Sequence, residues 1–178
     1  MLARLFGGVL LLAAVEPLLA QTECSKLSTL NLPHTTITSA ALVPEGAITA
    51  ARAGNVVAPA RCRVQAITRP SKDSEIRFEV WLPVSGWNGK YLQLGNGGWA
   101  GSINQAALAD PLRRGYAVAA TDDGHQSSSP GASWAVGHPE KLIDFGYRAV
   151  HETGVQAKAI LHAFFGRDAD RSYFSGCS

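Results

Sequence analysis

The last seven residues, 172–178, carry the clearest chemical candidate, because they form an apolar stretch that ends in Gly176, Cys177 and Ser178. A strand that ends in glycine, any residue and serine matches the first half of a nucleophile elbow, the G-x-S-x-G turn that directs a serine hydroxyl toward a carbonyl carbon. Glycine is needed there because a side chain would collide across the turn. The spacing therefore predicts Ser178 as a nucleophile; the alternative is a strand that ends in small turn residues.

A glycine-rich loop follows the short strand expected over residues 90–94, and residues 95–101 read GNGGWAG. Phosphate binding is a weak interpretation, because the lysine and hydroxyl residue of a Walker loop are missing. The loop can instead present backbone N–H groups of Gly97 or Gly98 to an oxyanion, as glycine loops of esterases do after an early strand. A simple turn is the competing interpretation, and the loop alone does not separate the two.

Residues 122–125 read DDGH and follow the nearly continuous apolar run 116–121. Two carboxylates and an imidazole could bind a metal ion, but no fourth ligand stands at a suitable spacing. Capping and loop hydrogen bonds are the favoured interpretation, so no metal is predicted. His34, His151 and His162 are predicted to be solvated or hydrogen-bonded residues rather than catalysts.

The composition is that of an ordinary globular protein, with 46% hydrophobic and 17% charged residues in a chain of 178. It excludes disordered, collagenous and membrane-spanning classes. The net charge of +2 is too small, and too evenly spread, to indicate nucleic acid or a membrane surface as a partner.

Residues 1–20 are predicted to be a signal peptide, with Arg4 as the positive charge, an apolar stretch over 5–15 and small residues before Gln21. The mature chain is then expected to be secreted or periplasmic, where cysteines can pair. Cys24 and Cys62 flank the first mature segment and are expected to close a loop. Cys177 is left over, which indicates a free thiol or a partner elsewhere.

Alternating and apolar runs predict strands over 35–43, 62–67, 76–82, 90–94 and 116–121, and helices over 104–114 and 139–165. Strand 76–82 should have one wet face, which carries Arg77 and Glu79 and suits an antiparallel strand near the edge of the sheet. Helix 139–165 should have a core stripe that includes Leu142, and an exposed ion pair between Asp144 and Arg148.

From residue 90 onward, strands alternate with helices, which predicts an α/β sheet. The glycine loop follows an earlier strand and the serine follows a later one, and this order is the one an α/β-hydrolase requires. Architecture thus supports the nucleophile and oxyanion interpretations together.

The ordered motifs resemble the tannase and feruloyl esterase family across nearly the whole mature chain. They read EVWLP at 79–83, WNGK at 87–90, GNGGWAG at 95–101, ATDDGH at 120–125, PEKLIDFGYRAVHE at 139–152 and YFSGCS at 173–178. The resemblance implies an α/β-hydrolase fold, of which residues 21–178 are the N-terminal portion: an incomplete, mostly parallel sheet with flanking helices. By this interpretation the chain ends at the nucleophile elbow, and the lid domain and the remainder are absent.

The resemblance also implies a serine esterase that acts on small-molecule esters of aromatic acids. Ser178 would be the nucleophile, Cys177 would be bonded to a cysteine that follows the catalytic histidine, and Gly97 or Gly98 would supply one oxyanion donor. The family's Asp and His come after the serine, so their identities lie beyond this chain. The family's calcium site belongs to the lid domain, and no cofactor is expected in this chain.

Without a base, the hydroxyl of Ser178 is a poor nucleophile, so the 178 residues alone are expected to be a truncated fragment with negligible esterase activity. Two other classes stay open. A non-catalytic secreted module would bind aromatic acids without turnover, and a serine peptidase on the same scaffold would cleave peptides in preference to aryl esters.

Overall fold

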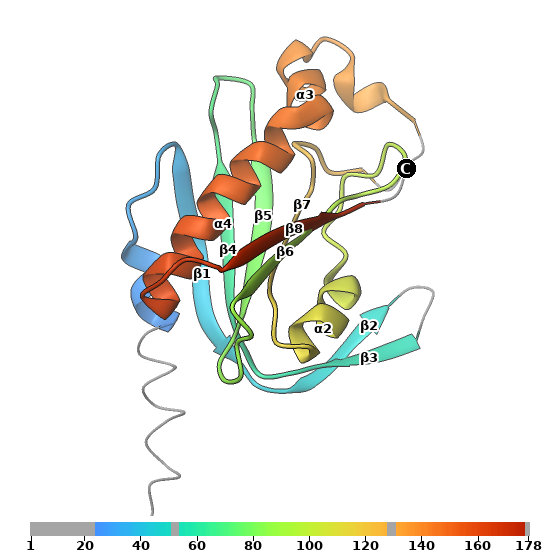
Figure 1. Ribbon diagram of the computed structural model, residues 1–178. Coiled ribbons are helices and arrows are strands. Elements are labelled where there is room, and N and C mark those ends of the chain that lie inside the picture. The colour runs from blue at the N-terminus through green and yellow to red at the C-terminus, as the bar shows by residue number, and fades with distance from the viewer. Residues whose placement is uncertain (1–23, 51–53, 128–130, 177–178) are drawn as a thin grey trace, which may run out of the picture.

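The computed structural model describes residues 24–50, 54–127 and 131–176 (Figure 1). Within these residues, six strands form a mixed sheet in the order β1-β4-β5-β7-β6-β8, and two more form a separate pair, β2-β3. The strands are β1 (Thr35–Val43), β2 (Gly46–Ala50), β3 (Gly54–Ala58), β4 (Arg61–Thr68), β5 (Ile76–Pro83), β6 (Lys90–Leu94), β7 (Ala117–Thr121) and β8 (Arg171–Ser175). The helical elements are η1 (Leu27–Thr29), α2 (Gln105–Arg113), η2 (Ser133–Ala135), α3 (Pro139–Ile143), the π-helical turn η3 (Asp144–Arg148) and α4 (Ala149–Phe165).

The α/β fold predicted from the sequence is confirmed, but the described part of the sheet is mixed rather than mostly parallel. Strands β1, β4, β5 and β7 pair antiparallel in that order, whereas β6 pairs parallel to both β7 and β8. Parallel neighbours need a crossover. Helix α2 supplies one between β6 and β7, and the helical segment from α3 to α4 lies between β7 and β8. The parallel part of the sheet therefore begins where strands and helices start to alternate in the sequence.

Helices cover both faces of the sheet. Helix α4 crosses one face, and α2 lies on the other together with the β2-β3 hairpin (Figure 1). The core on the α4 side includes Val64, Phe78, Val80, Tyr91, Ala157, Ile160 and Leu161. The core on the α2 side includes Ala58, Trp81, Leu108, Ala109, Leu112 and Val118. Strand β7 is buried along its whole length, as its continuous apolar sequence predicted.

Strand β5 corrects one expectation, because it is the third strand of the sheet and neither of its faces is wet along its length. Glu79, expected in solvent, is buried under α2 and accepts hydrogen bonds from Arg63 (2.6 and 2.9 Å), Trp81 (2.8 Å) and Gln105 (2.9 Å). Burial alone would raise the pKa of Glu79, but the hydrogen bonds from Arg63 and Trp81 outweigh it and the pKa lies below its usual value. Glu79, which the alternating pattern of β5 placed on a wet face, therefore belongs to an internal polar network.

A disulfide joins Cys24, before η1, to Cys62 on β4. Both cysteines are fully buried in the core on the α4 side, and their Cα atoms lie 5.6 Å apart. The bond ties the start of the described chain to an interior strand.

The long helix also departs from its expected form, because its path from Pro139 to Phe165 contains the π-helical turn η3. Leu142, expected in the core stripe, is 51% exposed. The end of the helix is as predicted: Gly166 has φ 70°, and its N–H donates to the carbonyl of His162 at 2.8 Å.

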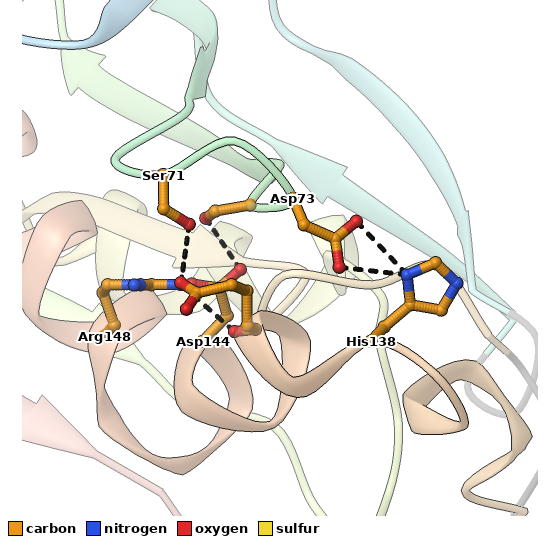
Figure 2. Close-up of polar contacts among 7 residues, drawn as sticks. Ser71, Asp73, His138, Asp144 and Arg148 are labelled. Carbon is orange, nitrogen blue, oxygen red and sulfur yellow. Dashed lines mark hydrogen bonds and ion pairs between the residues drawn. The ribbon is translucent and has the colours of Figure 1, made fainter.

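Asp144 and Arg148 form a buried contact rather than the exposed pair expected from their spacing. The side chain of Asp144 is 0% exposed and accepts from Arg148 Nε (2.5 Å) and from Ser74 Oγ (2.7 Å). Arg148 also pairs with Glu140 at 2.8 Å, and Ser71 Oγ donates to Glu140 at 2.6 Å (Figure 2). The loop between β4 and β5 covers this face of the helix, which the sequence of the helix alone does not indicate.

In the described residues, no helix combines the length and the apolar character that a membrane crossing requires.

Candidate active site

The glycine loop and the turn that follows β8 meet at one edge of the sheet. Because β6 and β8 are parallel neighbours, Gly95 after β6 and Gly176 after β8 lie side by side. The N–H of Gly95 donates to the carbonyl of Ser175 at 2.9 Å. A Cβ atom on Gly95 would lie 2.7 Å from the ring of Phe174, and one on Gly176 would lie 2.9 Å from it. Glycine at both positions lets the two segments pack together around this ring.

A cavity of about 560 Å³ opens at the same edge, within the size range of small-molecule sites. Its lining combines loop backbone with aromatic and aliphatic side chains: Gly95, Asn96, Gly98, Trp99, Phe145, Val150, Phe174 and Gly176, together with the carboxylate residue Asp123. The lining is mainly apolar and contains aromatic rings, so it suits a ligand with an aromatic or otherwise flat apolar part.

Aromatic rings continue from the cavity into the neighbouring loops. The ring centroids of Trp99 and Phe145 are 5.3 Å apart, and Trp134 lies at the same distance from Phe145. Trp134 also stacks on the imidazole of His125 at 3.9 Å. Trp99 keeps 47% of its surface exposed at the mouth of the loop. The aromatic cluster thus presents one accessible indole.

The turn through Gly97 and Gly98 has the exposed backbone that an amide donor needs. Gly98 has φ 58°, and a Cβ atom there would meet nothing within 4 Å. Glycine is therefore favoured at 98 by backbone conformation rather than by space. The N–H of Ala100 donates to the carbonyl of Gly97 at 3.3 Å and closes the turn.

Asp122 is buried at the end of β7. Its Oδ1 accepts from the backbone N–H groups of Arg77 (2.9 Å) and Gly124 (3.1 Å). Its Oδ2 has no hydrogen-bond partner among the described residues, and burial raises its pKa to about 7. The carboxylate therefore ties β5 to the loop that follows β7.

Asp123 and His125 hold loop geometry as well. Asp123 adopts a left-handed backbone (φ 55°) and accepts from Asn96 Nδ2 at 3.0 Å. Burial raises its pKa against the effect of that hydrogen bond. His125 Nε2 lies 2.9 Å from the carbonyl of Trp99. In the part of the chain that the structure describes, no cluster of three or more acidic, histidine or cysteine side chains is placed to hold a metal ion. The capping interpretation of residues 122–125 is confirmed for Asp122, whose Oδ1 accepts from Gly124.

The remaining histidines lie on the surface. His34 and His151 are exposed, and His162 is exposed with its Nδ1 2.9 Å from Asp168. His138, which directly precedes α3, has Nδ1 3.0 Å from Asp73 (Figure 2). The surface positions expected for His34, His151 and His162 are confirmed.

A family model described as tannase and feruloyl esterase matches residues 62–178. The chain belongs to this family. It is 49% identical over 173 residues to an uncharacterized esterase of Xanthomonas campestris, an alignment that covers 94% of this chain and 30% of that protein. It is 31% identical over 175 residues to feruloyl esterase B of Aspergillus niger, covering 94% of this chain and 33% of the fungal enzyme.

Solved structures agree with this assignment. Feruloyl esterase B from Aspergillus oryzae superposes with a TM-score of 0.77 at 30% identity, over 89% of this chain and 33% of that one. The chain thus spans about a third of the length of the relatives that it matches.

Some of the tannase and feruloyl esterase motifs lie within the described residues and others do not. Gly98 lines the cavity and Gly97 precedes it. Ser178 and Cys177 lie outside the described residues, as do residues 1–20, which were predicted to be a signal peptide. Strand β8 leads to Gly176, which lies beside Gly95 and directly precedes Cys177 and Ser178 in the sequence. The roles of Ser178, Gly97 and Gly98 and the pairing of Cys177 stay predictions.

The sequence analysis did not single out three of the residues that line the cavity: Asn96, Trp99 and Phe145. Asn96 and Trp99 stand within the glycine loop, where they are the polar and aromatic exceptions, and that contrast was the available signal. Phe145 lies within the segment 139–165 that was expected to form one helix, and the sequence carries no signal for the π-helical turn that contains it.

Proposed function

We propose that residues 21–178 form the N-terminal part of the catalytic domain of an exported serine esterase that hydrolyses esters of phenolic acids. One observation carries the proposal. The glycine loop after β6 and Gly176 after β8 come together at the carboxyl edge of parallel strands, beside an aromatic-lined cavity. Membership of the tannase and feruloyl esterase family supports the reaction type.

In the proposed reaction, Ser178 Oγ attacks the ester carbonyl carbon while a base takes its proton, and the carbonyl oxygen becomes an oxyanion. The N–H of Gly97 or Gly98 donates to that oxyanion, and the residue after Ser178 supplies a second N–H. The alcohol leaves as its oxygen receives the proton, which leaves the acid esterified to the serine. Water then attacks the acyl carbon while the base takes a proton from it; the bond to Ser178 Oγ breaks, Oγ receives that proton, and the acid is released. A histidine that follows Ser178 in the polypeptide serves as the base, and an acidic residue that also follows Ser178 orients the histidine.

Binding of an aromatic acyl group fits the aromatic lining formed by Trp99, Phe145 and Phe174. The chemistry uses side chains and backbone amides, so the proposal includes no cofactor for this chain, and calcium remains a proposal for a lid domain. Export is supported by the leader-like residues 1–20 and by the disulfide between Cys24 and Cys62. N-terminal sequencing of the exported protein should begin at Gln21.

The test is hydrolysis of methyl ferulate and methyl gallate by the full-length protein, compared with its Ser178→Ala variant. We expect turnover by the former, a loss of at least about 10⁴-fold in kcat for the latter, and labelling of Ser178 by a fluorophosphonate. Preferential cleavage of peptides would select a peptidase instead, and binding of ferulate without turnover would select a binding module. The 178-residue polypeptide tested alone should show negligible turnover, because it has no histidine that the family motifs place as base.

A further inference from the structure

The glycine loop (residues 95–101) is fastened to the loop after β7 (residues 122–127), which we call the aspartate loop. Asn96 Nδ2 donates to the carbonyl of Thr121 at 2.8 Å and to Asp123 Oδ2 at 3.0 Å. Farther along, His125 Nε2 contacts the carbonyl of Trp99 at 2.9 Å. Gly101 and Ser127 exchange two backbone hydrogen bonds of 3.2 Å each. The glycine loop is therefore held at its start and its end, with exposed Gly97 and Gly98 between.

Asn96 is the fastening nearest to the proposed oxyanion donors. It lines the cavity directly before Gly97, and its side-chain amide bridges from β6 to the end of β7. Gly97 and Gly98 lie between Asn96 and Trp99. Among the described hydrogen bonds, these two glycines take part in only one, from the N–H of Ala100 to the carbonyl of Gly97. The position of the Gly97 and Gly98 amides thus depends on where Asn96 is held.

The acceptor of Asn96 is itself rigidly placed. Asp123 is only 6% exposed, and its N–H donates to Thr121 Oγ1 at 3.2 Å, while that hydroxyl donates to the carbonyl of Arg77 at 3.0 Å. Oδ1 of Asp123 has no hydrogen-bond partner among the described residues. The hydrogen bond from Asn96 to Oδ2 is therefore the one that holds the carboxylate within the described structure. A carboxylate held in this way fixes the direction of the amide that donates to it.

The aspartate loop is supported from behind by Asp144. A Cβ atom on Gly124 would lie 2.4 Å from Cβ of Asp144, so the loop packs directly on the π-helical turn. Asp144 is fixed by Ser74 and Arg148 (Figure 2). A continuous set of contacts therefore runs from the helix, through Gly124 and Asp123, to Asn96.

We infer that Asn96 is a positioning residue for the esterase reaction, held by Asp123, which sets the place of the oxyanion donors at Gly97 and Gly98. This inference rests on the proposed function. Donor amides act when they lie about 2.7–3.1 Å from the oxyanion, and a misplacement of about 1 Å can cost roughly 100-fold in rate. Because the substrate carbonyl becomes an oxyanion only on reaction, loss of the Asn96 contacts should affect kcat more than KM.

The test uses the full-length protein and three variants. Asn96→Ala removes both side-chain hydrogen bonds. Asp123→Asn keeps an acceptor oxygen and tolerates the left-handed backbone, but it removes the charge from the hydrogen bond. Asn88→Ala is the matched control, because Asn88 also donates to a backbone carbonyl, that of Arg114 at 2.8 Å, but it precedes β6 at the opposite end of the strand.

The measurements are kcat and KM for methyl ferulate, and inhibition by an aryl trifluoromethyl ketone, which forms an oxyanion when it adds to the serine. Asn96→Ala should lower kcat about 10- to 100-fold, leave KM within about twofold, and weaken the ketone by the same factor as kcat. Asp123→Asn should lower kcat about 2- to 5-fold in the same pattern. Asn88→Ala should stay within about twofold of wild type.

The inference is overturned if a folded Asn96→Ala variant keeps wild-type kcat and ketone affinity, or if Asn88→Ala loses as much as Asn96→Ala. If Asn96→Ala does not fold, Asp123→Asn decides, and unchanged kcat and ketone affinity in that variant overturn the inference. Absence of turnover in the wild-type full-length protein is a different result, because it overturns the proposed function itself.

Discussion

Replacing Asp144 by Asn should destabilise the fold far more than its place in an i,i+4 pair would suggest. The side chain of Asp144 is 0% exposed, and its two oxygens accept from Arg148 Nε and Ser74 Oγ. Asparagine keeps the shape but turns one acceptor into a donor, so an N–H₂ group must face either Arg148 or Ser74. The same change leaves Arg148, which is 15% exposed, with Glu140 as its remaining acidic partner.

The magnitude follows from these contacts. Removing one partner of a buried ion pair costs about 3–5 kcal/mol, and the surviving Glu140 contact of Arg148 places this case at the lower end, about 3 kcal/mol. Asp110→Asn is the matched control, because Asp110 is also an aspartate that pairs with arginines of its own helix region. Its side chain lies 3.5 Å from Arg113 and 3.8 Å from Arg114, but it is 70% exposed. Its loss should cost less than about 0.5 kcal/mol.

Urea unfolding of the full-length protein, followed by tryptophan fluorescence, measures both variants. The expected result is a free energy of unfolding lowered by about 3 kcal/mol for Asp144→Asn and hardly changed for Asp110→Asn, with equal slopes. Equal stability of the two variants would refute the argument that burial and the second donor, Ser74, distinguish Asp144.

Three further predictions concern other parts of the fold. Burial raises the pKa of Asp122 from 3.8 to about 7, so ionisation of Asp122 destabilises the folded state as the pH rises through this window. The free energy of unfolding of Asp122→Asn, measured with urea, should therefore rise relative to that of wild type by roughly 4 kcal/mol between about pH 4 and pH 8. Parallel plots of the two free energies against pH would contradict this prediction. Replacing Cys24 and Cys62 by Ser opens a loop with a sequence separation of 38 and should lower the free energy of unfolding by about 4 kcal/mol; a change below about 1 kcal/mol would argue against it. Gly101→Ala places a Cβ atom 2.2 Å from the backbone oxygen of His125 and should cost about 1–3 kcal/mol in stability. Gly146→Ala, where the added Cβ atom meets nothing within 4 Å, should be neutral or stabilising. Thermal unfolding compares the two variants.

Elements that depend on local sequence were predictable. The apolar run that forms β7 and the glycine that ends α4 both follow from patterns within one segment. The alternation of strands and helices after residue 90 agrees with the need for a crossover between parallel neighbours.

Elements that depend on contacts between distant segments were not predictable. Glu79 was expected in solvent because its own strand alternates, yet its donors come from β4 and from α2. Asp144 was expected on the surface because its partner Arg148 lies on the same helix, yet Ser74 comes from the loop before β5. The β2-β3 hairpin, which helps to cover the second face, was likewise not anticipated.

Donor supply explains why the buried carboxylates of this fold have opposite effects on stability. Glu79 receives donors from Arg63, Trp81 and Gln105, and Asp144 receives a guanidinium and a hydroxyl, so each is compensated for lost hydration.

Asp122 instead receives two backbone N–H groups on one oxygen and none on the other among the described residues. Its raised pKa expresses that deficit, since a protonated Oδ2 needs less hydration than a charged one. What Asp122 provides is geometry, because the same Oδ1 holds Arg77 of β5 and Gly124 of the aspartate loop together. A residue that lowers stability while fixing the loop beside a proposed active site fits the usual opposition between stability and function, and Asp122→Asn, which keeps Oδ1, separates the charge from the geometry.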